Sequence, residues 1–256
     1  RYKMWRRLRD SLSRIFIATA LISSLSALAF FSSMKQSQLS SVQEIQSPNN
    51  VSNLLDRNSA RTVQKSRNSA VNIMSISEDG YISSSSGTYF TSGERHYVIT
   101  VGHGIVSDCG SVRILSGRNM TECIEMKIVD RQIDYAIMEV EPIDSREPIR
   151  IPRDYPLDRE WSSELAIQRT VYYTGYPNGM GPLTFGGEIS GHDTSENIYV
   201  HSFAWPGSSG SGVFSESGKL IGIIIAISVG ATEYGVDVLE DMVIVIPLYK
   251  IDWNVL

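Results

Sequence analysis

The sequence predicts an all-β protein, a barrel or a sandwich, from about Ala70 to the C-terminus. Short runs rich in Val, Ile, Tyr and Thr recur along this stretch, separated by Gly, Asp, Asn and Ser. No long helical period interrupts them, and many short strands at such a spacing are typical of barrels and sandwiches. The 256 residues leave room for one large domain or two small ones.

The expected strands fall into two groups on either side of a proline-rich stretch. Residues 141–160 contain four prolines and many charges, and proline is not found in central strands. We therefore expect a connection here between an N-terminal half, residues 69–158, and a C-terminal half, residues 159–256. Strands are expected at residues 70–76, 87–92, 96–101, 112–115, 123–130, 135–140, 170–176, 197–203, 220–229 and 242–248. A short helix is expected after Pro247.

The first 35 residues differ from the rest of the chain in charge and hydropathy. Residues 15–34 carry no charge, and about 20 such residues in a helix cross a hydrocarbon core of about 30 Å. Basic residues stand before this stretch at positions 1, 3, 6, 7, 9 and 14. By the positive-inside rule, residues 1–35 are expected to be a cytoplasmic basic N-terminus with a transmembrane signal-anchor, and the remaining chain to be extracytoplasmic.

Two alternatives to the anchor stay open. Ala27-Leu28-Ala29 has the Ala-x-Ala pattern of a signal-peptide cleavage site, which would give a secreted form. The third interpretation is a buried core helix, against which the one-sided basic flank argues.

Residues 36–68 indicate a linker because they are rich in Ser, Asn and Gln and have few large apolar side chains. Such segments are usually ordered only when something binds them. One hypothesis is therefore that the chain is a subunit of a larger membrane or virion assembly.

The charge of the body argues against a nucleic-acid partner. Residues 36–256 hold 16 basic and 27 acidic residues, a net charge of −11, whereas nucleic-acid binding needs a basic footprint. Cys109 and Cys123 are expected either to form a disulfide in a translocated domain or to remain two buried thiols. No zinc-ligand spacing occurs in the sequence.

The motif PGSSGSGVF at residues 206–214 is the strongest indication of chemistry. Its small residues allow a tight turn on which a serine can act as a nucleophile, with backbone amides stabilising an oxyanion. Ser209 is then the nucleophile, and Gly207 and Ser209 supply the amides of the oxyanion hole. A Gly/Ser-rich surface turn is the alternative, because short motifs give many false positives.

A serine nucleophile needs a base, and the base needs an orienting carboxylate. Of the histidines, His103 is the best candidate because it follows an apolar strand and lies between two glycines. His96 and His192 are expected at the surface, and His201 on the strand before the serine motif. Asp134 opens another apolar strand and is the candidate carboxylate, although an aspartate in a turn is common.

Taken together, three motifs resemble those of the chymotrypsin-like (trypsin-fold) serine proteases. ITVGHGI resembles their T-x-x-H element, DYAIMEV their Asp-x-Ala-[Leu/Ile] element, and PGSSGSGVF their Gly-x-Ser-Gly-[Gly/Ser] element. The order His, Asp, Ser matches this family. TGYPNG at 174–179 and GKLIGIIIAI at 218–227 are similar to segments of HtrA-type and glutamyl-endopeptidase-type members.

The resemblance covers residues 70–250 and implies two packed six-stranded antiparallel β-barrels with the active site between them. His103 and Asp134 then lie in the first barrel and Ser209 in the second, and no metal or organic cofactor is required. Ser211 is an alternative nucleophile, but Ser209 is the serine that occupies the nucleophile position of the Gly-x-Ser-Gly pattern. Ser208 stands where the digestive enzymes have Asp, which argues against zymogen-type activation. Gly104 stands where they have a disulfide cysteine.

The resemblance also suggests where a substrate side chain would bind. The pocket floor is expected at Phe203 and one wall near Ala226, Ile227 and Ser228, none of them charged. The resulting hypothesis is that the enzyme prefers an apolar or small side chain before the scissile bond. Alternatively, His201 would bind an acidic side chain at this position.

Three functions are therefore considered, with a membrane-anchored serine endopeptidase acting on protein or peptide substrates as the first. The second is a protease-fold scaffold subunit with little or no activity. The third is a β-barrel binding module with a coincidental Gly/Ser turn, against which the three ordered motifs argue.

Overall fold

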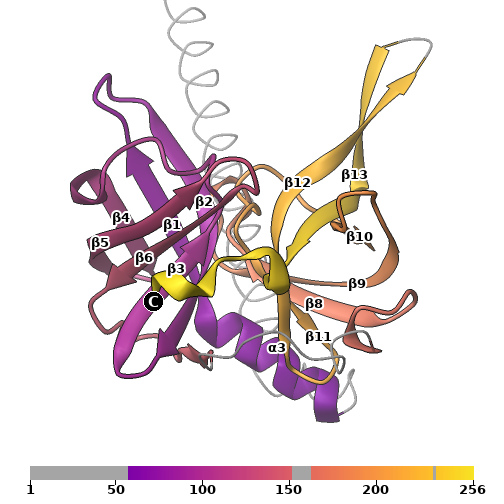
Figure 1. Cartoon of the computed structure of the whole chain (residues 1–256), viewed down its shortest axis with the longest axis horizontal. Helices are drawn as coiled ribbons and strands as arrows, with labels where there is room; N and C mark the ends of the chain where they lie inside the picture. Colours follow the sequence, from indigo (N-terminus) through magenta and orange to yellow (C-terminus); the bar gives the residue numbers. More distant parts are fainter. Residues whose placement is uncertain (1–56, 152–162, 233–234) are drawn as a thin grey trace, which may run out of the picture. The chain divides into compact units, whose positions relative to one another are not determined.

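The computed structural model describes residues 57–151, 163–232 and 235–256, with only the backbone described at 226–232 and 235–240. The first part is a six-stranded antiparallel barrel (Figure 1). Its strands are β1 (Ala70–Ile76), β2 (Ile82–Ser92), β3 (Arg95–Thr100), β4 (Val112–Ser116), β5 (Asn119–Asp130) and β6 (Tyr135–Val140). They pair in the order β1-β4-β5-β6-β3-β2, and β1 pairs again with β2 to close the barrel. A two-residue strand, β7 (Ile149–Arg150), adds to β2 in parallel.

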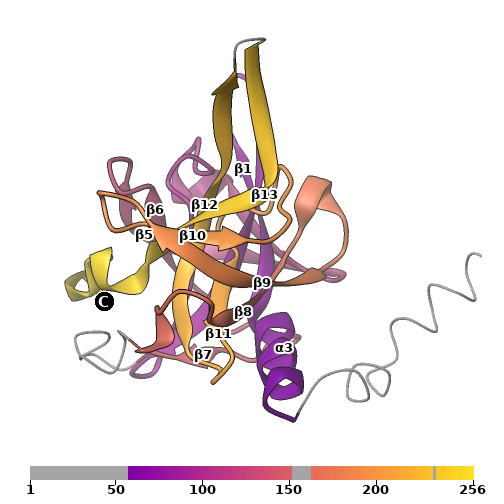
Figure 2. The same ribbon diagram turned by 90° about the vertical axis from the view of Figure 1, so that its right-hand side faces the viewer.

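A second closed barrel follows, with the strand order β10-β13-β12-β11-β8-β9 (Figure 2). Its strands are β8 (Thr170–Gly175), β9 (Leu183–His192), β10 (Ile198–His201), β11 (Gly212–Ser215), β12 (Leu220–Thr232) and β13 (Gly235–Pro247). β12 and β13 continue as a two-stranded ribbon beyond the barrel, paired as far as Thr232 opposite Gly235. The expectation of two six-stranded antiparallel barrels is thus confirmed.

The barrels share part of their hydrophobic core. Each has its own cluster of buried side chains. A third cluster joins Phe90, Ile99 and Tyr135 of the first barrel to Phe214 and Ile246 of the second. Burying such side chains is the dominant favourable term in folding, so this shared cluster ties the two barrels together.

Three barrel strands were missed or shortened in the sequence-based expectation. β11 was not expected, because most of its four residues belong to the serine motif at 206–214. β2 begins five residues earlier than expected, at Ile82, since a run of serines forms its first half. β9 was not expected at all. Its Gly186-Gly187 pair lowers the strand propensity, but a Cβ atom at Gly187 would lie 2.3 Å from the carbonyl oxygen of His201 on β10. Close approach of two strands therefore requires this glycine.

A polar helix, α3 (Arg57–Ser69), overlaps the end of the stretch, residues 36–68, in which the sequence indicates a linker. It packs beside β8 and β11 (Figure 2). Ser66 Oγ donates to Thr174 Oγ1 at 2.9 Å, and Thr62 Oγ1 donates to the carbonyl oxygen of Glu216 at 3.0 Å. The helix buries hydroxyl groups and a single valine, Val63, so it lacks the apolar stripe by which a surface helix is usually recognised.

The C-terminal residues form two 3₁₀ turns, η3 (Leu248–Lys250) and η4 (Trp253–Val255), where a short helix was expected. Within the described ranges, no helix is long and apolar enough to cross a membrane. The expected transmembrane segment at residues 15–34 lies outside those ranges, as does the boundary expected between residues 158 and 159.

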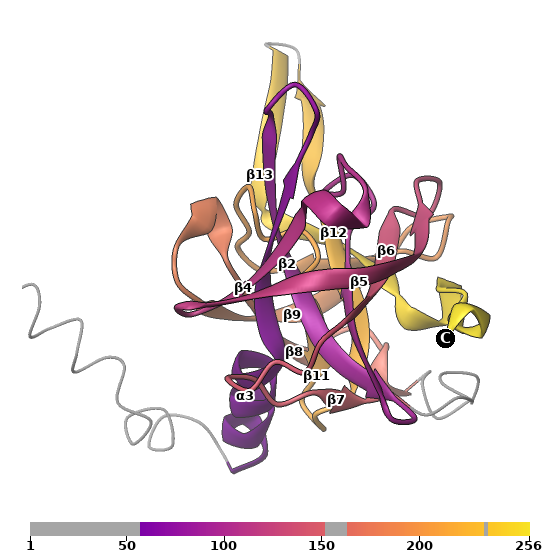
Figure 3. The same cartoon turned by 90° about the vertical axis from the view of Figure 1, so that its left-hand side faces the viewer.

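Cys109 and Cys123 form a disulfide with their Cα atoms 5.3 Å apart. It joins the 3₁₀ turn η1 (Cys109–Ser111) to β5, on the face of the first barrel that carries β4 and β5 (Figure 3). Of the two states that the sequence left open for these cysteines, the structure has the disulfide.

Candidate active site

The structure brings His103 and Asp134 together. His103 follows β3, and Asp134 lies in the turn between β5 and β6. Asp134 Oδ2 is 2.7 Å from His103 Nδ1, and Asp134 Oδ1 accepts the backbone N–H of His103 at 2.8 Å. A carboxylate can only accept hydrogen bonds, so Nδ1 carries the proton. The other ring nitrogen, Nε2, is then left as the basic atom.

The environment of Asp134 keeps it ionised. Burial raises the pKa of this carboxyl group, but the ring and backbone hydrogen bonds from His103 lower it, as do the charges of His103 and Arg131. The net result is a pKa below the ordinary value for aspartate. Asp134 also has a positive φ of 73°, a conformation that is uncommon outside glycine and that Asp tolerates better than most residues.

Arg131 holds the loop of His103, a contact that the sequence did not indicate. Its Nη1 donates to the carbonyl oxygen of Gly102 at 3.1 Å, and its Nη2 donates to that of Ile105 at 2.6 Å. The fixed fork of a guanidinium group suits two acceptors at once. Arg131 therefore fixes the backbone on both sides of the imidazole.

Ser209 lies in the loop between β10 and β11 and is partly exposed. Its Oγ donates to the carbonyl oxygen of Ile225 at 3.4 Å, and among the described residues it forms no hydrogen bond with His103. The loop nevertheless reaches the first barrel near the end of β3. A Cβ atom on Gly210 would lie 2.5 Å from Thr100 Oγ1, and Thr100 is three residues before His103.

The two neighbouring serines of the motif are buried. Ser211 is fully buried, and its Oγ donates to the carbonyl oxygen of Ser208 at 2.6 Å. Ser208 is 1% exposed, and its Oγ accepts the backbone N–H of Trp205 at 3.2 Å. Ser209 is thus the most accessible hydroxyl of the three.

In the turn formed by residues 205–211 of this loop, two backbone amides have no acceptor within the described part of the chain, namely those of Gly207 and Ser209. The amides around them are all paired. Ser208 N–H donates to the Trp205 carbonyl at 2.9 Å, and Gly210 N–H to the Ile224 carbonyl at 2.7 Å. The unpaired amides are the two that the motif indicates for an oxyanion hole.

Neighbouring hydrogen bonds fix the direction of both free amides. In a trans peptide the N–H and the C=O point in opposite directions. The Pro206 carbonyl accepts Asn178 N–H at 2.7 Å, which directs Gly207 N–H away from the turn of Asn178. In the same way, the Ser208 carbonyl accepts Ser211 N–H at 3.1 Å, which orients the N–H of Ser209.

Asn178 belongs to the TGYPNG segment, which forms the tight turn η2 (Pro177–Gly179) against the serine loop. A Cβ atom at Gly207 would lie 2.9 Å from the carbonyl oxygen of Tyr176, and the residue has a φ of +92°. Only glycine accommodates both constraints without strain.

The expected substrate-pocket residues all belong to the second barrel, with Phe203 in the loop after β10 and the others on strands. Phe203 is 57% exposed, and its carbonyl oxygen accepts the Tyr173 hydroxyl. His201 is exposed on β10, with Nε2 3.9 Å from a carboxylate oxygen of Asp241. Ala226 and Ser228 belong to β12. In the strand pairing, Ala226 is opposite Ile244 of β13 and Ser228 is opposite Leu239.

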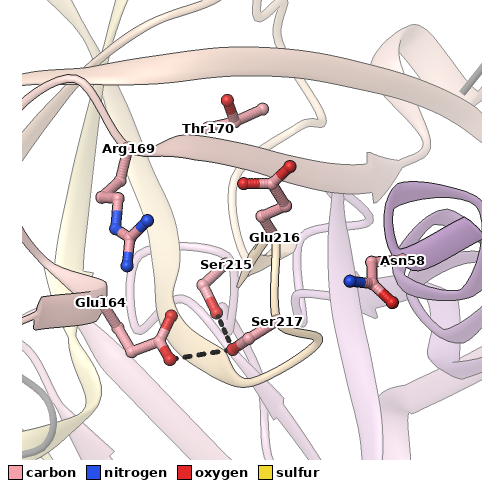
Figure 4. A pocket seen from close by; sticks show the side chains of 7 residues that line it. All are labelled: Asn58, Glu164, Arg169, Thr170, Ser215, Glu216 and Ser217. Atoms are coloured by element: carbon pink, nitrogen blue, oxygen red, sulfur yellow. Dashed lines mark hydrogen bonds between the residues drawn. The ribbon is translucent and has the colours of Figure 1, made fainter. Parts of the chain in front are cut away.

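A polar pocket of 170 Å³ lies away from these residues (Figure 4). Ser215, at the end of β11 opposite to Ser209, lines it together with Glu164, Ser217 and Asn58 of α3. Ser217 Oγ donates to Glu164 at 2.9 Å. Among the described residues no cluster of side chains is suited to hold a metal ion, and neither His103 nor Ser209 lines this pocket.

Comparison with known proteins agrees with the two-barrel fold. A family model for the trypsin-like peptidase domain matches residues 85–223, and no curated protein matches the sequence. A serine endoprotease from Yersinia pestis superposes with a TM-score of 0.57 at 20% identity, over 74% of this chain and 62% of that one. A Mycobacterium tuberculosis protease in its active form superposes with a TM-score of 0.54 at 18% identity, over 75% of this chain and 84% of that one.

Proposed function

Because the chain belongs to the trypsin-like peptidase family and carries a serine endopeptidase domain, we propose that it hydrolyses peptide bonds with Ser209 as nucleophile. His103 is the general base, Asp134 orients it, and the amides of Gly207 and Ser209 form the oxyanion hole. One observation carries the proposal: the two amides that have no acceptor within the described residues belong to the same turn as the accessible hydroxyl of Ser209, in a loop that contacts the strand leading to His103.

The reaction uses these groups in two steps. Ser209 Oγ transfers its proton to His103 Nε2 as it attacks the peptide carbonyl carbon, and the two amides stabilise the negative oxygen that forms. The imidazolium ion, stabilised by Asp134, then gives the proton to the leaving amine. Water next attacks the acyl-enzyme with the same base, which releases the carboxylic acid and restores Ser209.

The Ser209 hydroxyl must leave the Ile225 carbonyl to react. Its hydrogen bond is 3.4 Å long, beyond the usual range for O–H donors and hence weak. Rotation of a serine side chain between its staggered positions is therefore inexpensive, and catalytic hydrogen bonds are often loose before substrate binds.

The contacts of Ser211 support Ser209 as the nucleophile. Ser211 is fully buried and donates to the Ser208 carbonyl. An attack by Ser211 would break its hydroxyl bond to the Ser208 carbonyl, one of the two bonds that hold the peptide of the Ser209 amide, whereas an attack by Ser209 leaves both intact.

For specificity, we propose an uncharged pocket formed by Phe203, Ala226 and Ser228, which accepts an apolar or small side chain before the scissile bond. His201 is less suited to bind an acidic substrate side chain, because Oδ2 of Asp241 already lies 3.9 Å from its Nε2. A panel of peptides that differ only at this position tests the pocket, and efficient cleavage after Lys or Arg would contradict it.

We further propose that residues 15–34 anchor the chain as a single-pass membrane protein with the peptidase domain outside the cytoplasm. The uncharged stretch and the basic residues before it support this topology. The Cys109–Cys123 disulfide suits an oxidising compartment. Replacing Leu21 and Leu25 with arginine should release the protein from washed membranes, whereas full retention would contradict the anchor.

The bond between Ser209 and Ile225 also favours a second candidate, a scaffold subunit of a larger assembly with little or no activity. Labelling with a serine-directed fluorophosphonate distinguishes the two functions. We expect labelling of the wild type and of S190A, a surface control, but none of S209A. An unlabelled wild type, or equal labelling of S209A, would contradict the peptidase mechanism.

A further inference from the structure

We propose that Ser86, in the first barrel, is a positioning residue for the oxyanion hole in the second. This inference rests on the proposed function. Ser86 lies on β2, has no exposed surface, and uses its backbone N–H, its carbonyl oxygen and its hydroxyl in contacts that converge on the active-site loops.

The hydroxyl of Ser86 connects the two loops that build the oxyanion hole. Ser86 Oγ donates to the carbonyl oxygen of Gly207 at 2.7 Å and accepts the backbone N–H of Tyr176 at 2.8 Å. Tyr176 starts the turn whose Asn178 N–H holds the Pro206 carbonyl. One hydroxyl group therefore fixes the Gly207 carbonyl directly and the turn of Asn178 from its beginning.

This contact matters because glycine itself does little to fix the backbone at position 207. Glycine populates many backbone conformations with little difference in energy, so only its neighbours define the direction of its N–H. The peptide before Gly207 is held through Pro206 and Asn178. The peptide after it is held at its carbonyl oxygen by Ser86 and at the Ser208 N–H by the Trp205 carbonyl. With both peptides held, the Gly207 amide is oriented before substrate arrives, which is how preorganised donors stabilise an oxyanion most effectively.

The backbone of Ser86 links the nucleophile to the strand that leads to His103. Ser86 N–H donates to the carbonyl oxygen of Ser209 at 2.8 Å, and its own carbonyl oxygen accepts Thr100 Oγ1 at 2.6 Å. Replacing the side chain leaves these backbone bonds available. The hydroxyl can therefore be tested separately from the contact between the barrels.

The test compares steady-state kinetics on a peptide substrate in wild type, S86A, S86T and the control S116A. Ser116 is also a buried serine, and its hydroxyl lies 2.5 Å from that of Ser145, which takes no part in the site. For S86A we expect kcat to fall about 10- to 100-fold, less than the 10²- to 10³-fold loss typical of deleting an oxyanion donor outright. KM and the pH profile of kcat should not change, because substrate binding and the His103–Asp134 pair are intact.

Two further measurements separate positioning from a general structural role. Inhibition by a peptide aldehyde, which forms a tetrahedral adduct with an oxyanion, should weaken in S86A by about the same factor as kcat. S86T retains the hydroxyl and should recover most of the kcat lost in S86A. If S86A does not fold, S86C replaces it: a thiol is a weak donor, so its kcat should lie well below that of wild type.

An unchanged kcat in folded S86A or S86C would overturn the inference, as would an S86T variant as slow as S86A. An equal loss in S116A would also overturn it, because the effect would then reflect any buried hydroxyl. Failure of the proposed function looks different: the wild type itself would not be labelled by fluorophosphonate at Ser209.

Discussion

Asp134 accepts two hydrogen bonds from one residue, His103, one from the ring at Nδ1 and one from the backbone N–H. The two oxygens of the carboxylate are thereby both used on the same partner. This fixes the tautomer of the imidazole and, at the same time, its position relative to the loop. The relationship makes the role of Asp134 testable in two independent ways, through catalysis and through stability.

Replacing Asp134 with asparagine should lower kcat about 10³- to 10⁴-fold at neutral pH. An amide group can present its NH₂ to Nδ1, which stabilises the wrong tautomer and removes the basic nitrogen from Nε2; a loss of this size is known for the same change in a Ser-His-Asp enzyme. Steady-state kinetics measure the effect. The control E139Q removes a carboxylate that pairs with Arg95 and Lys127 on the same barrel, and it should retain activity. A D134N enzyme within tenfold of wild type would contradict the triad.

The stability that Asp134 contributes should depend on pH in a defined direction. Its pKa is lower in the folded chain than the ordinary value of about 3.9. Its ionised form therefore stabilises the fold above about pH 5, and this contribution is lost as the pH falls through the folded pKa. The difference in free energy of unfolding between wild type and D134N should shrink from pH 6 to pH 3. Denaturant titrations measure this difference in free energy of unfolding, with E122Q as an exposed control. A difference that grows as the pH falls would contradict the prediction.

Removing the side chain of Arg131 should impair catalysis although no proposed triad residue is replaced. In R131A the carbonyl groups of Gly102 and Ile105 lose their shared donor, so His103 is held less firmly and kcat should fall about tenfold or more. R131K should recover only part of the loss, because an ammonium group lacks the fork. The matched control is R113A, since Arg113 also donates to two carbonyl groups, those of Gly110 and Val112, but away from His103. Equal kcat values in R131A and R113A would contradict the role of Arg131 in holding the loop of His103.

Gly175 should not tolerate even a methyl group. A Cβ atom there would lie 2.2 Å from Ser211 Oγ and 2.9 Å from Ser86 Oγ. G175A should therefore lower the free energy of unfolding by about 1–3 kcal/mol, as overpacking generally does. It should also lower kcat, because it displaces the two hydroxyl groups that hold the oxyanion loop. Thermal unfolding and kinetics check this against G191A, where a Cβ atom meets nothing within 4 Å. An active G175A with wild-type stability would show that the loop adjusts freely.

Much of the fold could be read from the sequence because its strands are chemically distinct from its turns. The strand at residues 70–76 was expected with the bounds that β1 has in the structure. The apolar strand ending before His103 and the one beginning after Asp134 were also recognised. In each case branched and aromatic residues are followed by residues that favour turns, so local composition carries the information.

The elements that escaped sequence analysis depend on close contacts between distant segments. β9 needs Gly187 because β10 passes against it, and α3 packs through hydroxyl groups with hardly any apolar side chains. The roles of Arg131 and Ser86 likewise depend on contacts with distant segments. Their roles come from carbonyl groups that are brought to them by other loops, and no local pattern marks such acceptors.

The sequence by itself determined the family of this chain, the trypsin-like peptidases, because the motifs around His103, Asp134 and Ser209 have residue types and an order that are specific. The tertiary structure decided how those groups are held. It pairs His103 with Asp134 and places Ser86 of one barrel against the serine loop of the other. Within the ranges that the structure covers, it also leaves the amides of Gly207 and Ser209 without an acceptor. The physical reason is the range of the interactions: side-chain chemistry and strand propensity are local, whereas the direction of a backbone amide is set by hydrogen bonds between residues far apart in the chain.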